Sequence, residues 1–307
     1  MSASSTGMLA RRPAAHRGRI RRAVRRSWPA YLLLLPFLVH FVLVVAYPFL
    51  YSIYLSFFQA GLNTAPTFVG LRNFAQLFGD VDFRTALGNT FYYAVFAVIG
   101  DTIIPLAMAI ILNEQLRGRI VFRMAYFLPV VTSWAVVSLI WLILFDQQGV
   151  VNGLLQAVGV APQPFLANGT QAKWIIIAAG VWKDMGYYMV IYLAALQSVP
   201  RDLVEAAAID GAGNWRSLWH VTLPSLRPVI YFVITIATIY TMQFFTPPYI
   251  MTQGGPLNAT LSVVLLLYRT AFVQLDFGYG SAMATVLFVI LAALSFLNKK
   301  VNDWVTR

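Results

Sequence analysis

Apolar residues along this chain fall into long uninterrupted segments rather than into the short or alternating runs of a soluble core. The first segment, Ala30 to Phe58, spans roughly 43 Å as a helix, which exceeds the thickness of about 30 Å of a bilayer's hydrocarbon core. Five further segments pass the same length test: residues 89–112, 122–145, 173–197, 227–252 and 278–297. The pattern therefore predicts an all-α integral membrane protein with six transmembrane helices.

The composition of the chain supports this interpretation. Of the 307 residues, 59% are apolar and 11% are charged, whereas a soluble domain has about half apolar and about a quarter charged residues. The polar residues are too few to cover a soluble core of this size. The chain contains no cysteine, which excludes disulfide scaffolds, cysteine-ligated zinc, iron–sulfur clusters and thiol nucleophiles.

The net charge of +11 reflects how the basic residues are distributed. Residues 1–28 carry eight arginines and no acidic residue, which is typical of a disordered tail on anionic lipid headgroups; a nucleic-acid-binding tail is the alternative. Around the six spans, seventeen Lys and Arg residues lie on the side of this tail and four on the other. The positive-inside rule then places both termini in the cytoplasm. We expect a basic cytoplasmic tail, residues 1–28, followed by a membrane domain, residues 29–307.

The segment from Thr260 to Phe272 is apolar but too short to cross a bilayer. A crossing there would also move Lys299 and Lys300 to the outer side, against the charge rule. The Gly-Gly-Pro sequence before the segment favours a turn. We therefore expect a short interfacial helix at the outer face.

Residues 198–226, between the fourth and fifth spans, form a longer connection than a helical bundle needs. Helix signals predict a first helix over residues 201–210 that stops at Gly211, where glycine adopts the left-handed conformation. A second helix, capped by Asn214 and ended by Pro224, follows. Its apolar face is formed by Trp215, Leu218 and Trp219. The result is a cytoplasmic helix–turn–helix whose tryptophans either anchor a partner protein or pack against the underside of the bundle.

Polar residues inside the predicted spans are costly in lipid, and each marks either a pathway or a helix contact. Asp101 lies midway along the second span. Two sets share a helix face by spacing: Lys183, Asp184, Tyr187 and Tyr188 on the fourth span, and Tyr240, Gln243, Phe244 and Pro247 on the fifth. Aromatic faces with hydrogen-bonding groups suit a sugar ring, so these side chains are the candidate substrate path. The alternatives are helix packing and, for Lys183, a side chain that reaches the outer interface.

The loop at residues 198–226 resembles the EAA signature of permease subunits of bacterial ATP-binding-cassette importers. The matching residues are Glu205, Ala206, Ala207, Gly211, Val221, Leu223 and Pro224, with Val221 standing where the family usually has isoleucine. Other segments are similar to the sugar-importing branch of the family, which includes maltose-type and glycerol-3-phosphate-type permeases. They are Arg123-x-x-x-Phe127-x-Pro129, Trp141-x-x-x-Phe145, Gly149-x-x-Asn152, Trp182-Lys183-x-x-Gly186 with Leu196-Gln197, Thr252-Gln253-Gly254-Gly255-Pro256 and Tyr268-x-x-Ala271-Phe272.

The resemblance implies a permease subunit in the bacterial plasma membrane that forms half of the translocation path for a sugar or sugar-like solute. Its implied partners are a second permease subunit, usually a different chain, two copies of a cytoplasmic ATPase, and an extracytoplasmic solute-binding protein. ATP and Mg²⁺ would bind to the ATPase, because this chain has no G-x-x-x-x-G-K-[ST] phosphate loop, and no enzymatic activity or cofactor is expected on it. The implied ATPase-coupling positions are Glu205, Ala206, Ala207, Asp210, Gly211, Leu223 and Pro224.

Two other classes of protein remain as alternatives. A self-contained secondary transporter would need a coupling-ion site, for which Asp101, Lys183 and Asp184 are sparse material. A membrane enzyme would need clustered chemistry, but the three histidines fall in the tail, the first span and the cytoplasmic loop. The solute remains open among disaccharides, oligosaccharides, polyols and glycerol phosphates.

Overall fold

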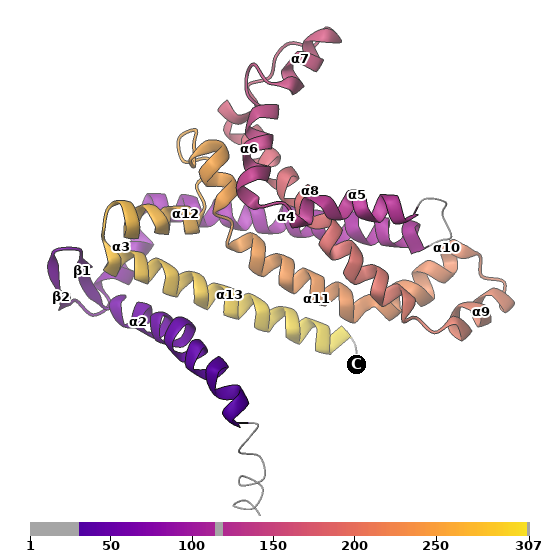
Figure 1. The fold of residues 1–307 in the computed structure, drawn as a ribbon, viewed down its shortest axis with the longest axis horizontal. Coiled ribbons are helices and arrows are strands. Elements are labelled where there is room, and N and C mark those ends of the chain that lie inside the picture. The colour runs from indigo at the N-terminus through magenta and orange to yellow at the C-terminus, as the bar shows by residue number, and fades with distance from the viewer. Residues whose placement is uncertain (1–30, 114–118, 306–307) are drawn as a thin grey trace, which may run out of the picture. The chain divides into compact units, whose positions relative to one another are not determined.

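The computed structural model describes residues 31–113 and 119–305, so the basic tail expected at residues 1–28 lies outside the described part (Figure 1). The chain divides into two units, one ending at Tyr54 and the other beginning at Leu55. Most of the first predicted span belongs to the first of these units.

The described part of the first unit belongs to one helix, which begins at Tyr31 and contains a π-helical stretch, η1 (Phe41–Ala46), followed by α2 (Tyr47–Leu55). It is long and apolar enough to cross a membrane. The rings of Tyr47, Tyr51 and Tyr54 stack along it, with successive centroids 5.9 and 6.0 Å apart. No residue of its most apolar window is buried.

The second unit opens with a short antiparallel hairpin that the apolar pattern did not predict. Strand β1 (Phe58–Gly61) pairs with β2 (Thr64–Phe68), and helix α3 (Arg72–Gly79) follows. The side-chain amide of Asn73 in α3 donates hydrogen bonds to the carbonyls of Ser56 and Phe58, each at 2.9 Å. These bonds tie α3 to the start of the hairpin.

Four long helices form the core of the second unit: α4 (Val81–Asn113), α8 (Gly169–Gln197), α11 (Leu223–Met242) and α13 (Phe277–Val305). Helices α4 and α8 run in the same direction: Tyr92 lies 5.8 Å from Trp174 between ring centroids, and Gly100 further along α4 faces Val181 further along α8. Helix α11 runs opposite to α13, because Met242 at its end packs with residues near the beginning of α13. Three of the ranges contain predicted spans, whereas α11 covers only the first part of the predicted fifth span, residues 227–252.

The predicted third span, residues 122–145, is not one straight helix. It consists of α5 (Arg119–Val131) and α6 (Trp134–Leu144), and the direction of the chain bends by 106° between these two helices. Pro129 sits in the last turn of α5, and the side chain of Ser133 caps α6 by accepting a hydrogen bond from the Val136 N–H. A proline followed by a strong N-cap residue breaks the helix where continuous apolarity predicted none.

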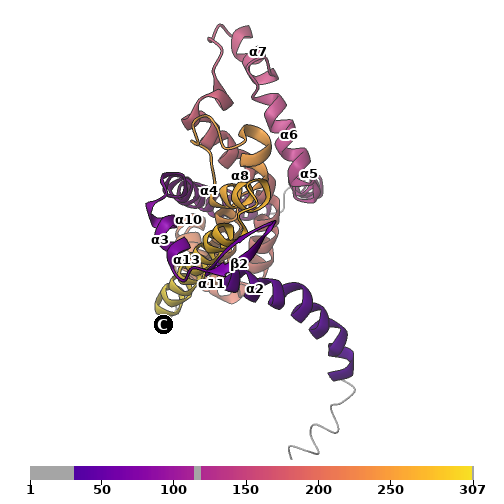
Figure 2. The ribbon, with the colours of Figure 1, turned by 90° about the vertical axis from the view of Figure 1, so that its left-hand side faces the viewer.

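Helix α6 and the following α7 (Val150–Ala157) project away from the four long helices in both views (Figures 1 and 2). A single buried side chain, Asn152, organises the loop beyond them. Its amide donates to the carbonyls of Gln147 and Gln163, at 3.0 and 2.9 Å, and its oxygen accepts from the Gln163 N–H at 2.8 Å. The chain then passes through the short turn η2 (Phe165–Ala167) into α8.

The predicted fifth span is displaced toward the loop that precedes it. Helices α10 (Asn214–Ser217), η3 (Leu218–Thr222) and α11 form one continuous helix from Asn214 to Met242. The expectation that Pro224 ends the second loop helix is therefore wrong. The π-helical turn η3 rearranges the backbone hydrogen bonds just before the proline, which allows the helix to continue.

The helix expected at residues 260–272 is present as α12 (Val263–Tyr268) and η5 (Arg269–Val273), after the turn η4 (Pro248–Thr252). It does not simply lie on a surface. Val263 and Leu265 are fully buried in the core cluster that contains residues of α4 and α13, whereas Phe272 and Val273 at its end are exposed. The inner half of this segment is thus a core element, because its apolar residues pack on helices instead of on lipid.

Candidate functional site

The first candidate site is the loop between α8 and α11, where α9 (Arg201–Ile209) follows Pro200. Gly211 has a φ of +79°, so the predicted left-handed stop is confirmed. The N–H groups of Asp210, Gly211 and Ala212 donate to carbonyls of the last turn of α9, at 3.0, 3.1 and 2.9 Å. A Cβ at Gly211 would meet nothing within 4 Å. Glycine is needed there for its backbone conformation and not for space.

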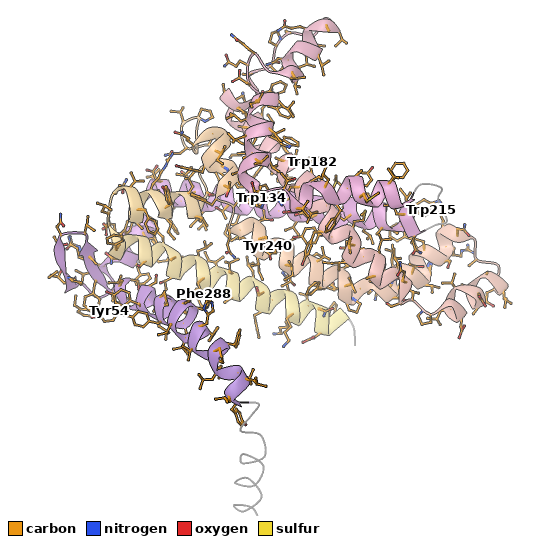
Figure 3. The ribbon with its side chains drawn as sticks, in the orientation of Figure 1. Tyr54, Trp134, Trp182, Trp215, Tyr240 and Phe288 are labelled. Carbon is orange, nitrogen blue, oxygen red and sulfur yellow. The ribbon has the colours of Figure 1, made fainter. Side chains whose placement is uncertain are left out.

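The loop presents large apolar side chains to the outside of this chain. Ile209 is 86% exposed, Trp215 73% and Trp219 61%. Figure 3 shows Trp215 at the end of the second unit, beside the loop helices. The tryptophans therefore do not pack against the underside of the bundle, which was the alternative left open by the sequence. An exposed apolar cluster of this kind is typical of a protein–protein interface.

The remaining loop positions divide by burial. Glu205, Ala206 and Asp210 are exposed, and Ala207 is half-buried. Leu223 and Pro224 are half-buried where the loop passes into α11. The expected cap Asn214 is the first residue of α10, and the N-cap is Gly213, without a side-chain hydrogen bond. The second loop helix is thus fixed by its continuity with α11 and not by the cap that was predicted.

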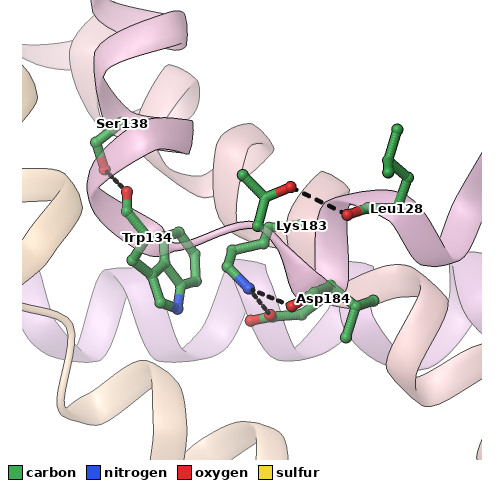
Figure 4. A network of polar contacts seen from close by, with 7 residues as sticks. Leu128, Trp134, Ser138, Lys183 and Asp184 are labelled. Atoms are coloured by element: carbon green, nitrogen blue, oxygen red, sulfur yellow. Dashed lines mark hydrogen bonds and ion pairs between the residues drawn. The ribbon is translucent and has the colours of Figure 1, made fainter.

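The second candidate site comprises the polar residues of α8. Lys183 is 6% exposed, and its ammonium group donates to the Val130 carbonyl at 3.3 Å (Figure 4). The same nitrogen lies 3.8 Å from a carboxylate oxygen of Asp184 and 5.0 Å from the centre of the Trp134 ring. Lys183 is therefore held inside the protein and does not reach an outer interface, contrary to one alternative from the sequence.

Asp101 of α4 is also buried, at 3% exposure, and its Oδ1 has no hydrogen-bond partner among the described residues. The Tyr192 hydroxyl of α8 is likewise buried without a hydrogen-bond partner in that part of the chain. Sequence reasoning found Asp101 from its charge but passed over Tyr192, because a tyrosine in an apolar helix carries no comparable signal. Buried polar atoms of this kind require a partner or water.

The predicted stripe of Tyr240, Gln243, Phe244 and Pro247 does not exist as one helix face, because α11 ends at Met242. Tyr240 is 60% exposed and lies on the long helix (Figure 3), and Gln243 is exposed at its C-cap. Phe244 instead turns into the core, 6% exposed, with its ring 5.7 Å from Trp134. The stripe separates into an exposed part and a buried part.

The two tyrosines of α8 also differ in burial. Tyr187 is 41% exposed, whereas Tyr188 is 1% exposed, and their rings meet edge to face at 5.3 Å. Tyr187, Tyr240 and Gln243 are therefore the members of the predicted substrate path that are accessible from outside this chain. Lys183, Phe244 and Tyr188 are buried, and Asp184 is half-buried.

A network of hydrogen bonds in the first half of α4 was not predicted from the sequence. Asn89 donates to the carbonyls of Asn258 and Leu261, at 2.9 and 3.0 Å, and the Tyr93 hydroxyl donates to the Thr260 carbonyl at 3.0 Å. The Thr260 hydroxyl in turn donates to the Gly255 carbonyl at 2.8 Å. These bonds fix the Gly-Gly-Pro turn against α4, so this motif has a structural role.

The described residues contain no group of three or more His, Asp or Glu side chains placed to hold a metal ion. What they do provide is a set of long apolar helices, polar groups buried among them, and an exposed apolar loop between α8 and α11. This combination defines a helical membrane protein with a surface built to meet a partner.

The model of the family described as binding-protein-dependent transport system inner membrane component matches residues 102–307. The chain belongs to this family and is a multi-pass permease component of the bacterial inner membrane.

Similar proteins support the same assignment. The arabinooligosaccharides transport system permease protein AraP of Bacillus subtilis is 34% identical over 276 residues, covering 89% of this chain and 88% of AraP. The lactose transport system permease protein LacF of Rhizobium radiobacter is 38% identical over 257 residues, covering 82% of this chain and 86% of LacF. A chain of the solved bacterial alginate ABC transporter, in complex with alginate pentasaccharide-bound periplasmic protein, superposes with a TM-score of 0.84 at 21% identity, covering 94% of this chain and 99% of that one. The last comparison concerns the fold alone.

Proposed function

We propose that this chain forms half of the translocation path of an ATP-driven importer for a disaccharide or oligosaccharide. Relatives that transport lactose and arabinooligosaccharides support this solute class. The other half is a second permease subunit of different sequence, and a solute-binding protein delivers the sugar at the outer face. Two copies of a cytoplasmic ATPase bind ATP and Mg²⁺ and drive the cycle.

The observation that carries the proposal is the exposed apolar loop between α8 and α11. Ile209, Trp215 and Trp219 are large apolar side chains that the other described residues leave exposed. In the proposed complex each ATPase subunit receives such a loop in a groove, with Glu205, Ala206, Ala207, Asp210 and Gly211 as the docking and turn positions. A docked loop moves with the ATPase when the two ATPase subunits close on ATP.

The continuity of the helix from Asn214 to Met242 gives this movement a path into the membrane. Leu223 and Pro224 lie half-buried within that helix, at the point where the loop becomes α11. A helix of this length spans roughly 43 Å, so a displacement at Trp215 is carried to the exposed Tyr240 near the other end. Trp215 of the loop and Tyr240 of the candidate path thus belong to one continuous helix.

The lengths of the helices support six crossings, and the distribution of Lys and Arg residues supports a cytoplasmic location for both termini. Four described helices are long and apolar enough to cross, and the bent pair α5–α6 makes a fifth. The remaining helix, α8, has the length but carries Lys183 and Asp184 in its middle. Because α4 and α8 run parallel, the chain between them must return across the membrane, and α5–α6 supplies that crossing.

The accessible part of the path consists of Tyr187, Tyr240 and Gln243. Tyrosine rings stack on sugar faces, and an amide and hydroxyls supply the hydrogen bonds that the sugar loses with water. Lys183, Asp184, Tyr188 and Phe244 support these residues from behind. A path that opens to one side of this chain is completed by the second permease.

The decisive experiment uses two glycines of the loop that differ in backbone conformation. The importer, assembled with its ATPase and binding protein, is reconstituted in vesicles, and ATP-dependent sugar uptake is measured for Gly211→Pro, Gly211→Ala and the matched control Gly213→Ala. Gly211 has a φ of +79° and Gly213 has a φ of −68°, and at both positions an added Cβ would meet no atom within 4 Å. We expect no uptake for Gly211→Pro, reduced uptake for Gly211→Ala because the left-handed conformation costs about 1–2 kcal/mol, and native uptake for Gly213→Ala.

Native uptake by Gly211→Pro would refute coupling through the loop. Sugar accumulation by this chain in vesicles without any ATPase would refute the importer and favour a self-contained secondary transporter. Insertion of each variant into the membrane is checked by its yield after detergent extraction, so that loss of uptake is read as loss of coupling.

A further inference from the structure

The break between α5 and α6 leaves a backbone carbonyl without its usual helical partner. In a continuous helix the Val130 carbonyl would accept a hydrogen bond from the N–H four residues later, which belongs to Trp134, the first residue of α6. The ammonium group of Lys183 takes this place, at 3.3 Å. A broken span inside a membrane requires such a replacement, because no bulk water is present to pair the freed carbonyl.

Lys183 contacts both sides of the break. Val130 lies in the last turn of α5, where the exposed carbonyl ends of the helix attract a positive charge. Trp134 begins α6, and the centre of its ring lies 5.0 Å from the same ammonium group. Figure 4 shows Lys183 reaching from α8 toward Trp134 on one side and the end of α5 on the other. One side chain therefore bridges the two arms.

Neighbouring positions of α8 hold this helix close to the break. A Cβ at Gly186 would lie 2.1 Å from the Tyr126 carbonyl oxygen, so α8 meets α5 backbone to backbone there. A Cβ at Gly180 would lie 2.8 Å from the Phe244 ring, which itself packs on Trp134. Gly180 and Gly186 lie three residues before and after Lys183. Because both allow close packing, they fix the distance between the α8 backbone and the break that Lys183 contacts.

We propose that Lys183 is a positioning residue that sets the bend of the third span. It acts through the Val130 carbonyl and the Trp134 ring, and it does not touch the solute. The direction of α6, which projects from the long helices, then depends on a residue of α8. This assignment rests on the contacts alone and holds whether or not the loop between α8 and α11 couples to an ATPase.

The test measures the distance across the bend between two spin labels by pulsed electron–electron double resonance. Met124 on α5 and Ile143 on α6 are 61% and 64% exposed, and the chain has no cysteine, so Met124→Cys and Ile143→Cys carry the labels without background. The full chain, purified in lipid nanodiscs, is measured with native Lys183, with Lys183→Met and with Lys183→Arg.

We expect a narrow distance distribution for the native chain. Methionine has a similar length to lysine but no charge. In Lys183→Met, the population at the native distance relative to the population at all other distances should therefore fall about tenfold or more, because a hydrogen bond to a charged group is lost from a buried site. Lys183→Arg should restore most of the native peak, since arginine retains the charge, the donors and the contact with an aromatic face.

The matched control is Lys173→Met, another lysine of α8 that lies over an aromatic ring, Tyr92, at 5.2 Å. It is remote from the break and should leave the distribution unchanged. A native distribution in Lys183→Met, or an equal change in Lys173→Met, would overturn the proposal.

A second variant covers the case in which Lys183→Met does not yield folded protein. Trp134→Leu removes the aromatic face and leaves the bond from Lys183 to Val130. Broadening of the distribution in Trp134→Leu supports the bridge across the break, and a native distribution in that variant overturns it. The distance readout needs no transport, so failure of this proposal is distinguished from failure of the proposed function.

Discussion

Replacing Gly186 by alanine tests whether α5 and α8 pack as closely as the structure shows. The added methyl group would lie 2.1 Å from the Tyr126 carbonyl oxygen and 2.9 Å from its carbonyl carbon. Ordinary contacts of this kind are roughly 3.5 Å, so the helices must separate by roughly 1 Å. The atoms that block the methyl group belong to the backbone and cannot rotate away.

The expected loss of stability in Gly186→Ala follows from two opposing effects. Overpacking of a tight interior costs about 1–3 kcal/mol, and separation of the helices also weakens the contacts on either side. Alanine regains about 1 kcal/mol over glycine inside a helix. The net destabilisation should therefore be about 1–2 kcal/mol. For domains of 150–250 residues, 1 kcal/mol shifts Tm by about 2–4 °C, which predicts a decrease of about 2–8 °C.

The assay is thermal unfolding in detergent, followed by tryptophan fluorescence at one fixed scan rate, because membrane proteins often unfold irreversibly. The matched control is Gly88→Ala in α4, where a Cβ would meet nothing within 4 Å. This control gains helix propensity without a clash and should unfold at the native temperature or above it. An unchanged or raised Tm in Gly186→Ala would refute the backbone contact between α5 and α8.

Three further predictions concern separate parts of the chain. Asn152→Ala should expose the loop between α7 and α8 to limited proteolysis at least about fivefold faster, because its buried amide ties Gln163 in the middle of that loop to Gln147 ahead of α7; equal cleavage rates would contradict this. Trp215→Ala combined with Trp219→Ala should leave Tm within about 1 °C, since both side chains are exposed, yet lower the amount of co-purified ATPase about tenfold or more; undiminished co-purification would contradict docking there. Tyr93→Phe should raise hydrogen exchange in the turn before α12 about fivefold, because one buried hydrogen bond is lost, and native exchange there would argue against that bond.

The sequence predicted the features that depend on local chemistry. Length and apolarity located the long helices, because a membrane span needs a fixed number of apolar residues whatever its neighbours are. The left-handed turn at Gly211 was equally predictable, since glycine after a short helix satisfies the last carbonyls through its own backbone conformation. The exposure of Trp215 was not predictable, because composition does not say whether an apolar side chain has a partner within the same chain.

Features that depend on contacts between distant segments were missed. The 106° bend between α5 and α6 occurs inside a uniformly apolar segment, and the group that pairs its freed carbonyl comes from α8. The end of α11 at Met242 was placed too late, because Phe244 leaves the helix to pack against Trp134. In both places a tertiary contact overrides the periodicity of the local sequence.

Under the proposed function, the packing of the long helices decides how a movement of the loop is transmitted through the second unit. Helices α4 and α8 meet closely, since a Cβ at Gly100 would lie 2.7 Å from Val181, and α5 is fixed to α8 at Gly186. The helix from Asn214 to Met242 carries the loop at one end and the exposed Tyr240 near the other. Packed elements of this kind shift as rigid bodies and do not deform continuously. This helix shares a buried core with α4 and α8 through Leu226, Val233 and Ala237. Under the proposed function, a pull on the loop is therefore expected to shift the helix across that core as a unit, which changes the position of Tyr240 relative to Tyr187 and so the shape of the path at the surface where the second permease closes it.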